Sequence, residues 1–168
     1  YFTPAAGGLH LVPVVGGQLV TPVQNVAVYQ IVSSGRQTIQ LGTQGNAVGG
    51  MVNLTSQVLP SSLNTLVIPR GVTAIRNFSE SSVFSLSGSF INGGAFYATS
   101  TNPNISTATI LAKDIINQPG AIISTLLPSG GLPGISGSLP GLNLSLKATQ
   151  SIINAGSISS AGTLTMYA

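Results

Sequence analysis

The stretch LSLKATQSIINAGSISSAGTLTM, residues 144–166, decides the expected fold. It contains two short runs in which apolar and polar residues alternate. In the first run, Leu144 and Leu146 face one side while Ser145 and Lys147 face the other, because successive side chains of a β-strand point to opposite faces. Alternation of this kind over a few residues is typical of a half-buried strand.

Similar runs rich in Val, Ile, Thr, Phe and Tyr occur along the whole chain, separated by Gly, Asn, Ser or Pro. No window of 11 or more residues sustains a helical apolar period. The best helical candidate is 110–117, but its Ile-Ile pair and the following Pro119 favour a strand. The sequence therefore predicts an all-β protein, with strands at 26–32, 37–41, 65–69, 72–75, 83–90, 107–112, 143–148 and 162–167.

Three segments, at 90–96, 116–122 and 153–158, share one pattern: apolar, Asn, one or two spacers, Gly, small, apolar. The Asn residues are separated by 25 and then 37 positions, and a Gly/Pro-rich insertion at 127–141 explains the longer interval. We expect a strand to end on a buried Ile, Asn and Gly to form a positive-φ corner, and a second short strand to begin after it. Stacked Asn side chains would then hydrogen-bond to one another. The predicted corner residues are Asn92, Gly94, Asn117, Gly120, Asn154 and Gly156.

Residues 144–166 resemble the repeats of the filamentous-haemagglutinin family of large bacterial surface proteins, whose rungs read L-x-L-x-A … I-x-N-x-G-x-I-x-S-x-G-x-L-x-L. Residues 83–126 are similar more loosely, and Asn102-Pro103-Asn104 is similar to an Asn-Pro-Asn turn of that family's secretion domain. The resemblance implies a right-handed parallel β-helix, secretion across an outer membrane, and a role in adhesion or in a matrix. The chain departs from the family in having so few charges and so little Asp.

The repeat does not extend to the N-terminus. We therefore expect an irregular β-rich cap or arm at 1–60 and β-helix rungs, a short solenoid, at 61–168. The apolar segment 9–31 is broken by Pro and Gly. It either covers the first coil or packs on an adjacent subunit by adding a strand to its sheet.

Charge is the most unusual feature of the composition. A soluble domain of this length would carry about 42 Asp, Glu, Lys and Arg residues, whereas this chain has five basic and two acidic ones. Disorder is not expected, because 43% of the residues are hydrophobic and mean hydropathy is +0.47. The chain is therefore expected to pack against itself or against copies of itself.

Several partners are not expected. The bases are scattered rather than clustered, which argues against nucleic acid. Pro and Gly interrupt the long uncharged stretch at 9–31, so no membrane-spanning segment is predicted. There is no cysteine for disulfides or thiolate metal sites. The first residues lack the basic region of a signal peptide, so any targeting segment is expected either to have been removed or to lie outside this sequence.

Catalytic groups are few. His10 is the single histidine, and a Ser-His-Asp arrangement would have to recruit Asp114 without a G-x-S-x-G motif. Glu80 and Asp114 are the only carboxylates available for a glycosidase pair, and two isolated acids do not make a Ca²⁺ site. We therefore predict no enzyme activity, no metal site and no cofactor.

Two surface features are also expected. Four Asn-x-Ser/Thr sequons offer possible glycosylation sites on an outer face, although a chain so rich in Ser and Thr would contain two or three by chance. Thr-rich segments at 99–101, 107–109 and 163–165 are more simply read as solvent-facing strand positions than as an ice- or sugar-binding face. The sequon asparagines are Asn53, Asn77, Asn104 and Asn143.

The sequence thus predicts a non-enzymatic structural subunit of an extracellular filament or cell-surface matrix. It would assemble head to tail with itself through stacked β-helix ends and the apolar N-terminal arm. The alternative is a fragment of a large secreted adhesin that binds glycans or proteins of host or neighbouring cells.

Overall fold

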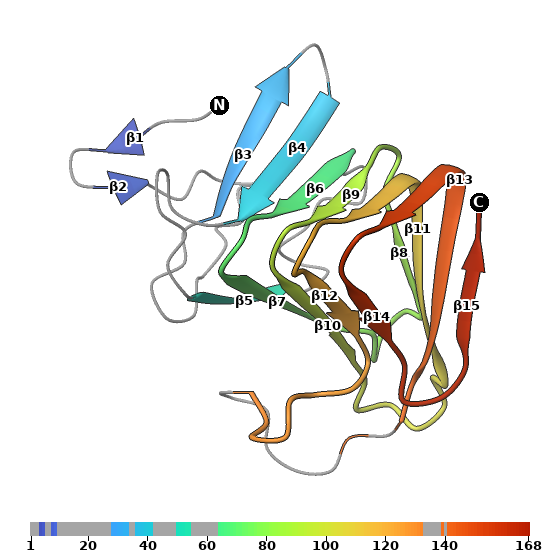
Figure 1. Ribbon diagram of the computed structural model, residues 1–168. Helices are drawn as coiled ribbons and strands as arrows, with labels where there is room; N and C mark the ends of the chain where they lie inside the picture. The colour runs from blue at the N-terminus through green and yellow to red at the C-terminus, as the bar shows by residue number, and fades with distance from the viewer. Residues whose placement is uncertain are drawn as a thin grey trace.

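The computed structural model describes residues 64–132, 139 and 141–168, together with the backbone of five strands that precede them. All regular elements in this part of the chain are strands (Figure 1), so the all-β prediction is confirmed there. The strands are β1 (Pro4–Ala5), β2 (Gly8–Leu9), β3 (Val28–Ser33), β4 (Arg36–Leu41), β5 (Gly50–Leu54), β6 (Thr65–Ile68), β7 (Val72–Asn77), β8 (Val83–Ser85), β9 (Phe90–Asn92), β10 (Ala95–Thr99), β11 (Thr107–Asn117), β12 (Ile122–Ser124), β13 (Asn143–Asn154), β14 (Ser157–Ser159) and β15 (Leu164–Tyr167).

The strands pair in parallel, with two antiparallel exceptions, β1 with β2 and β3 with β4. One sheet has the order β15-β13-β11-β9-β6-β4-β3, with β8 added beside β11. A second sheet has the order β14-β12-β10-β7-β5, and β1 and β2 form a separate two-stranded sheet. The two larger sheets are open, and their strands lie at regular intervals along the chain, so residues far apart in sequence are stacked on one another (Figure 1).

The larger sheet bends in the middle of β11 and β13, so each of these two strands belongs to two successive runs of paired strands. The first half of β11 pairs with β8 and its second half with β9, and the register of β11 on β13 shifts between Ala112 and Asp114. We therefore distinguish three stacks of parallel strands. Stack 1 contains β8, the first halves of β11 and β13, and β15; stack 2 contains β4, β6, β9 and the second halves of β11 and β13; stack 3 contains β5, β7, β10, β12 and β14. We use the word coil for one passage of the chain through the three stacks, such as β9, β10 and the first half of β11.

The core lies between the stacks, where alternate residues of each strand point inward and form columns. Within a column each residue is the register partner of the next, so apolar side chains lie directly on one another. Phe90 and Phe96 meet edge to face, with ring centroids 5.1 Å apart. Four columns are Phe84–Ile110–Leu146–Met166, Ala108–Leu144–Leu164, Leu66–Phe90–Ile115–Ile152 and Ala74–Phe96–Ile123–Ile158.

Several sequence predictions need adjustment. The run 83–90 is two strands, β8 and β9, separated by Gly88, where a Cβ would lie only 2.7 Å from the Asn64 carbonyl oxygen. The candidate helix 110–117 is part of β11, as the sequence favoured. The expected ranges leave out β1, β2 and β5, whereas the second short strand expected after each corner is present as β10, β12 and β14.

Parallel pairing also occurs within the region predicted to be an arm or cap. Strand β4 pairs with β6, and β5 pairs with β7. Strand β3 then lies antiparallel on the other edge of β4, at the opposite end of the sheet from β15 (Figure 1). The apolar segment 9–31 falls mostly outside the described residues.

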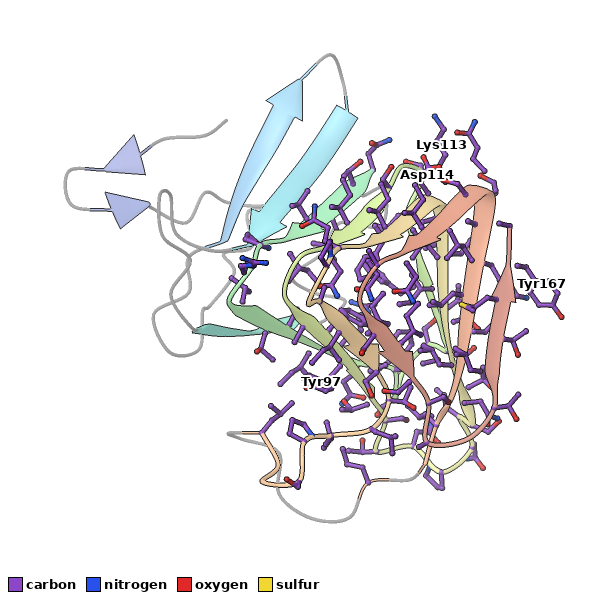
Figure 2. The ribbon with its side chains drawn as sticks, in the orientation of Figure 1. Tyr97, Lys113, Asp114 and Tyr167 are labelled. Atoms are coloured by element: carbon purple, nitrogen blue, oxygen red, sulfur yellow. The ribbon has the colours of Figure 1, made fainter. Side chains whose placement is uncertain are left out.

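Part of the insertion at 127–141 folds back on the outer side of stack 3. Leu127 and Leu132 pack against a small apolar cluster centred on Ile75 of β7 and Tyr97 of β10. Figure 2 shows Tyr97 on the side of the strands that faces this loop. The cluster is separate from the core between the stacks, so β7 and β10 are covered on both faces.

Candidate functional site: the asparagine corner and the open end

The three repeat asparagines end three strands that lie next to one another. Asn92, Asn117 and Asn154 are the last residues of β9, β11 and β13, and each is the register partner of the next. Asn92 and Asn117 are 0% and 1% exposed, while Asn154 is exposed. The corner thus places three carboxamides in one row between stack 2 and stack 3.

These carboxamides hydrogen-bond to one another. Asn92 Nδ2 donates to Asn117 Oδ1 at 2.9 Å, and Asn117 Nδ2 donates to Asn154 Oδ1 at 2.9 Å. Each donor also reaches a backbone carbonyl of the following coil, that of Ile122 at 2.8 Å and that of Ser157 at 3.0 Å. A buried amide of this kind must be satisfied to be tolerated, and here both N–H groups of Asn92 and of Asn117 have acceptors.

The glycines at the corner are required mainly by space. A Cβ on Gly94 would lie 2.1 Å from the Val72 carbonyl oxygen, and one on Gly156 would lie 2.3 Å from that of Ala121. Of the three predicted corner glycines only Gly120 has a positive φ, +78°. The expected positive-φ corner is therefore wrong for Gly94 and Gly156, because these turns are shaped by close approach to the preceding coil.

The expectation that a buried Ile precedes each Asn is also wrong. Ile91 and Ile116 are only half-buried and Ile153 is exposed. Side chains alternate along a strand, so an inward Asn places its predecessor outside and the residue before that inside. Phe90 and Ile115 accordingly occupy the core.

The inward-facing side chains of the columns become more exposed at the last coil. Leu146 is 0% exposed, whereas Met166, its register partner on β15, is 50% exposed. Leu144 and Leu164 differ in the same way. On the side away from β11 and β12, no described strand pairs with β14, β15 or the second half of β13. We call this surface the open end; its larger side chains are Ile152, Ile153, Asn154, Ile158, Leu164, Met166 and Tyr167.

One charged side chain lies inside the described part of the molecule, at the other end of the core. Arg76 is buried, with its guanidinium 4.7 Å from the centroid of Phe84 and 5.9 Å from that of Phe78. Burial lowers the pKa of Arg76, while the carboxylate of Glu80 acts in the opposite direction. An arginine over aromatic faces keeps its charge at ordinary pH, so we assign this contact to packing.

The candidate catalytic groups are not brought together among the described residues. Asp114 lies at the bend between the halves of β11, beside Lys113 (Figure 2), and accepts a hydrogen bond from Ser151 Oγ at 2.6 Å. Glu80 lies in the turn after β7, near Arg76. His10 lies outside the described residues. Within the described part, no three His, Cys, Asp or Glu residues form a group that could hold a metal ion, and no helix there could cross a membrane.

The four sequons occupy different settings. Asn77 and Asn104 are exposed, each in a tight turn. Asn143 is half-buried, and its side-chain oxygen accepts the backbone N–H of Thr163 at 2.7 Å. Asn53 belongs to β5, opposite Ile75. Asn77 and Asn104 therefore leave the most room for a glycan.

The Asn-Pro-Asn turn joins two coils. Asn102 Nδ2 donates to the Ser79 carbonyl at 3.0 Å, and Asn102 Oδ1 accepts the backbone N–H of Asn104 at 3.0 Å. The Thr-rich segments do not form an unbroken Thr array, because Asn143 and Ser145 of β13 lie in register with Thr107 and Thr109 of β11.

Sequence reasoning missed a second polar row. Ser124 Oγ lies 2.8 Å from Ser159 Oγ, and Thr125 Oγ1 donates to the Leu142 carbonyl at 2.8 Å. The spacing of Ser124 and Ser159 is close to that of Asn117 and Asn154, so extending the repeat alignment past residue 122 would have found it. It also missed the contrast between the inner coils and the open end, which depends on which strand is last in each stack.

Comparisons with protein-family models, with curated proteins and with solved structures found no match to this chain.

Proposed function

We propose that this chain is a non-enzymatic structural segment of a large extracellular or cell-surface protein, built as a right-handed parallel β-helix. Three parallel stacks, inward apolar columns and a hydrogen-bonded asparagine corner support this geometry. The resemblance of residues 144–166 to filamentous-haemagglutinin repeats supports this proposal by analogy. It involves no cofactor.

The observation that carries the function is the contrast along each column. Core side chains of the inner coils are buried, while their register partners in the last coil are half-buried, as Ile152 and Ile158 are, or exposed, as Leu164 and Met166 are. Unpaired strand edges beside exposed apolar side chains form a surface that accepts further strands. We propose that its biological role is to stack a further coil, so that the β-helix extends as a long rod of an adhesin type.

An experiment tests this directly. A copy of residues 113–126 fused after Ala168 would continue the coil, because Tyr167 is in register with Lys147, and Lys147 with Leu111. If the open end accepts a coil, this extension raises the urea midpoint of unfolding and the m-value, since more surface is buried. A scrambled extension of the same composition is the control. Equal unfolding curves for the two extended chains would overturn the proposal.

A homopolymeric filament is the second candidate, favoured by the low charge of the chain and the apolar open end. Head-to-tail stacking would place the open end on the N-terminal coils of another copy. There the antiparallel strand β3 already occupies the edge of β4, so one of the three stacks is covered. This pairing makes the extended rod the better-supported reading.

The filament has its own test. Met166→Asp would place a charge at the open end, whereas Leu126→Asp changes a leucine of equal exposure, 50%, that lies on a loop. A filament predicts that concentrated wild-type protein forms rods in negative stain, that Met166→Asp abolishes them and that Leu126→Asp does not. Monodisperse particles from all three proteins would rule the filament out. Attachment to glycans or proteins of other cells stays a proposal, to be tested by binding of the purified chain to cell surfaces.

A further inference from the structure

The asparagine corner has a direction. Asn92 donates both side-chain N–H groups toward the following coil, to Asn117 Oδ1 and to the carbonyl of Ile122, the first residue of β12. Asn117 does the same toward Asn154 Oδ1 and the carbonyl of Ser157, the first residue of β14. The donors therefore point from each coil to the next one along the chain, and the acceptors point back.

Asn154 is the last member of this row. Its Oδ1 accepts hydrogen bonds from Asn117 Nδ2 and from the backbone N–H of Gly156 at 3.2 Å. Its Nδ2 has no hydrogen-bond acceptor in the described part of the chain. If the repeat continues, this group meets two acceptors on an incoming coil, a side-chain oxygen at the corner and the first carbonyl of the next strand of stack 3.

Among the described strands, those that precede β9 in stack 2 end on an aliphatic residue and not on asparagine. Ile68 is the register partner of Asn92 and is 1% exposed, so the row begins on an apolar side chain. One coil earlier, β4 ends at Leu41, and β3 covers the other edge of β4 with Val28 opposite Leu41. A second copy stacked by its N-terminal end would thus bring β3, with an aliphatic residue at this position, to Asn154.

We propose that the open end selects a parallel coil that carries asparagine in register with Asn154. The inference rests on the proposed function, since it specifies the partner of the same surface. An incoming coil buries Asn154 as Asn117 is buried, and an apolar corner residue then leaves one N–H group without an acceptor. A buried unsatisfied donor is costly, so a coil with asparagine at this position is preferred over a coil with leucine by about tenfold in stacking equilibrium.

The test compares two extended proteins. Both carry the copy of residues 113–126 after Ala168; in one the copied Asn117 is kept, and in the other it is replaced by leucine. Hydrogen exchange of the Asn154 side-chain amide is followed by NMR in both. We expect exchange about tenfold slower with the asparagine coil, and a double-mutant cycle with Asn154→Leu should remove the difference between the two coils in unfolding stability.

The outcomes separate this inference from the function on which it rests. Equal protection of Asn154 by both coils would overturn the selectivity while leaving coil stacking intact. Absence of protection by either coil would overturn both. Sedimentation of the unextended chain tests the choice of occupant. Dimers that also slow exchange at Asn154 would overturn this choice, because two open ends would then be covering each other.

Discussion

Asn117 and Asn154 are the same residue in the same corner, yet one is buried and the other exposed. Both accept a side-chain amide from the preceding coil, and both follow an Ile-Ile pair. The difference is that the second half of β13 stacks on the second half of β11 and covers Asn117, while no described strand pairs with the second half of β13 on the side away from β11. Burial in this fold is therefore set by the next coil, and a residue's role depends on its place in the stack.

The two regions consequently carry different tasks. The inner coils hold the structure together through columns such as Phe84–Ile110–Leu146. The last coil presents the same kinds of side chain to the surroundings. Pairs of matched substitutions, one in each region, test how far this distinction holds.

The largest contrast is expected in the apolar column that contains Leu146 and Met166. Leu146→Ala removes a fully buried side chain and should lower the free energy of unfolding by about 3 kcal/mol. Met166→Ala removes a side chain that is half exposed and should cost less than about 1 kcal/mol. Urea unfolding measures both, and equal losses would contradict the distinction between inner coils and open end.

The corner should show a similar difference. Asn117→Leu leaves an N–H group of Asn92 and the Ser157 carbonyl without partners, so a loss of about 2.5 kcal/mol is expected. Asn154→Leu leaves the amide of Asn117 and the backbone N–H of Gly156 each short of one acceptor, near solvent, and should cost about 0.5 kcal/mol. Thermal unfolding measures the loss of stability in both variants. A larger loss for Asn154→Leu would show that the inner asparagines do not contribute most of the stability of the row.

Two corner glycines separate the effect of limited space for a side chain from the effect of a positive φ angle. Gly94→Ala places a Cβ against the Val72 carbonyl and should cost about 2 kcal/mol. Gly120→Ala meets no atom within 4 Å but sits at φ +78°, and should cost about 1 kcal/mol. If denaturant unfolding ranks them the other way, close approach to the preceding coil is not what selects glycine at the corner.

The smallest effect is expected on the outer face of the inner coils. Burial raises the pKa of Tyr97 above its ordinary value of 10.0. The folded state therefore holds this proton more tightly than the unfolded chain does, and the corresponding stability is complete below pH 10 and is lost as pH rises through the folded pKa. Between pH 9 and 11 the wild type should lose slightly more stability than Tyr97→Phe, by less than about 1 kcal/mol. Parallel losses would mean that the loop at 127–132 does not shield the phenol.

Much of the fold could be predicted from the sequence because alternation and repetition are local properties. The runs at 107–112 and 143–148 alternate clearly, and both are parts of strands in stack 1. The repeated Asn at 92, 117 and 154 indicated which strand ends lie in register. Short strands such as β12 and β14 were expected from their place after each corner, although three residues are too few to show a period by themselves.

The rest depended on contacts between distant residues. Each carboxamide in the asparagine row donates toward the coil that follows it. The spacing of the asparagines in the sequence does not show on which side of each carboxamide that coil lies. The burial of Arg76 against Phe84 was hidden for the same reason, since a basic residue in a strand ordinarily faces solvent. The fold-back of Leu127 and Leu132 onto Tyr97 was hidden because a Gly/Pro-rich insertion shows no period.

The last coil has the same register and the same kinds of side chain as the inner ones, and it differs in lacking a neighbour on one side. Hydrogen exchange of the backbone amides of β14 and of the second half of β13, measured beside those of β12 in the chain with and without the copied residues 113–126, tests this difference. We predict that these amides exchange much faster than those of β12 in the unextended chain and approach the rate of β12 once the coil is added. Unchanged fast exchange in β14 and in the second half of β13 after extension would contradict this explanation.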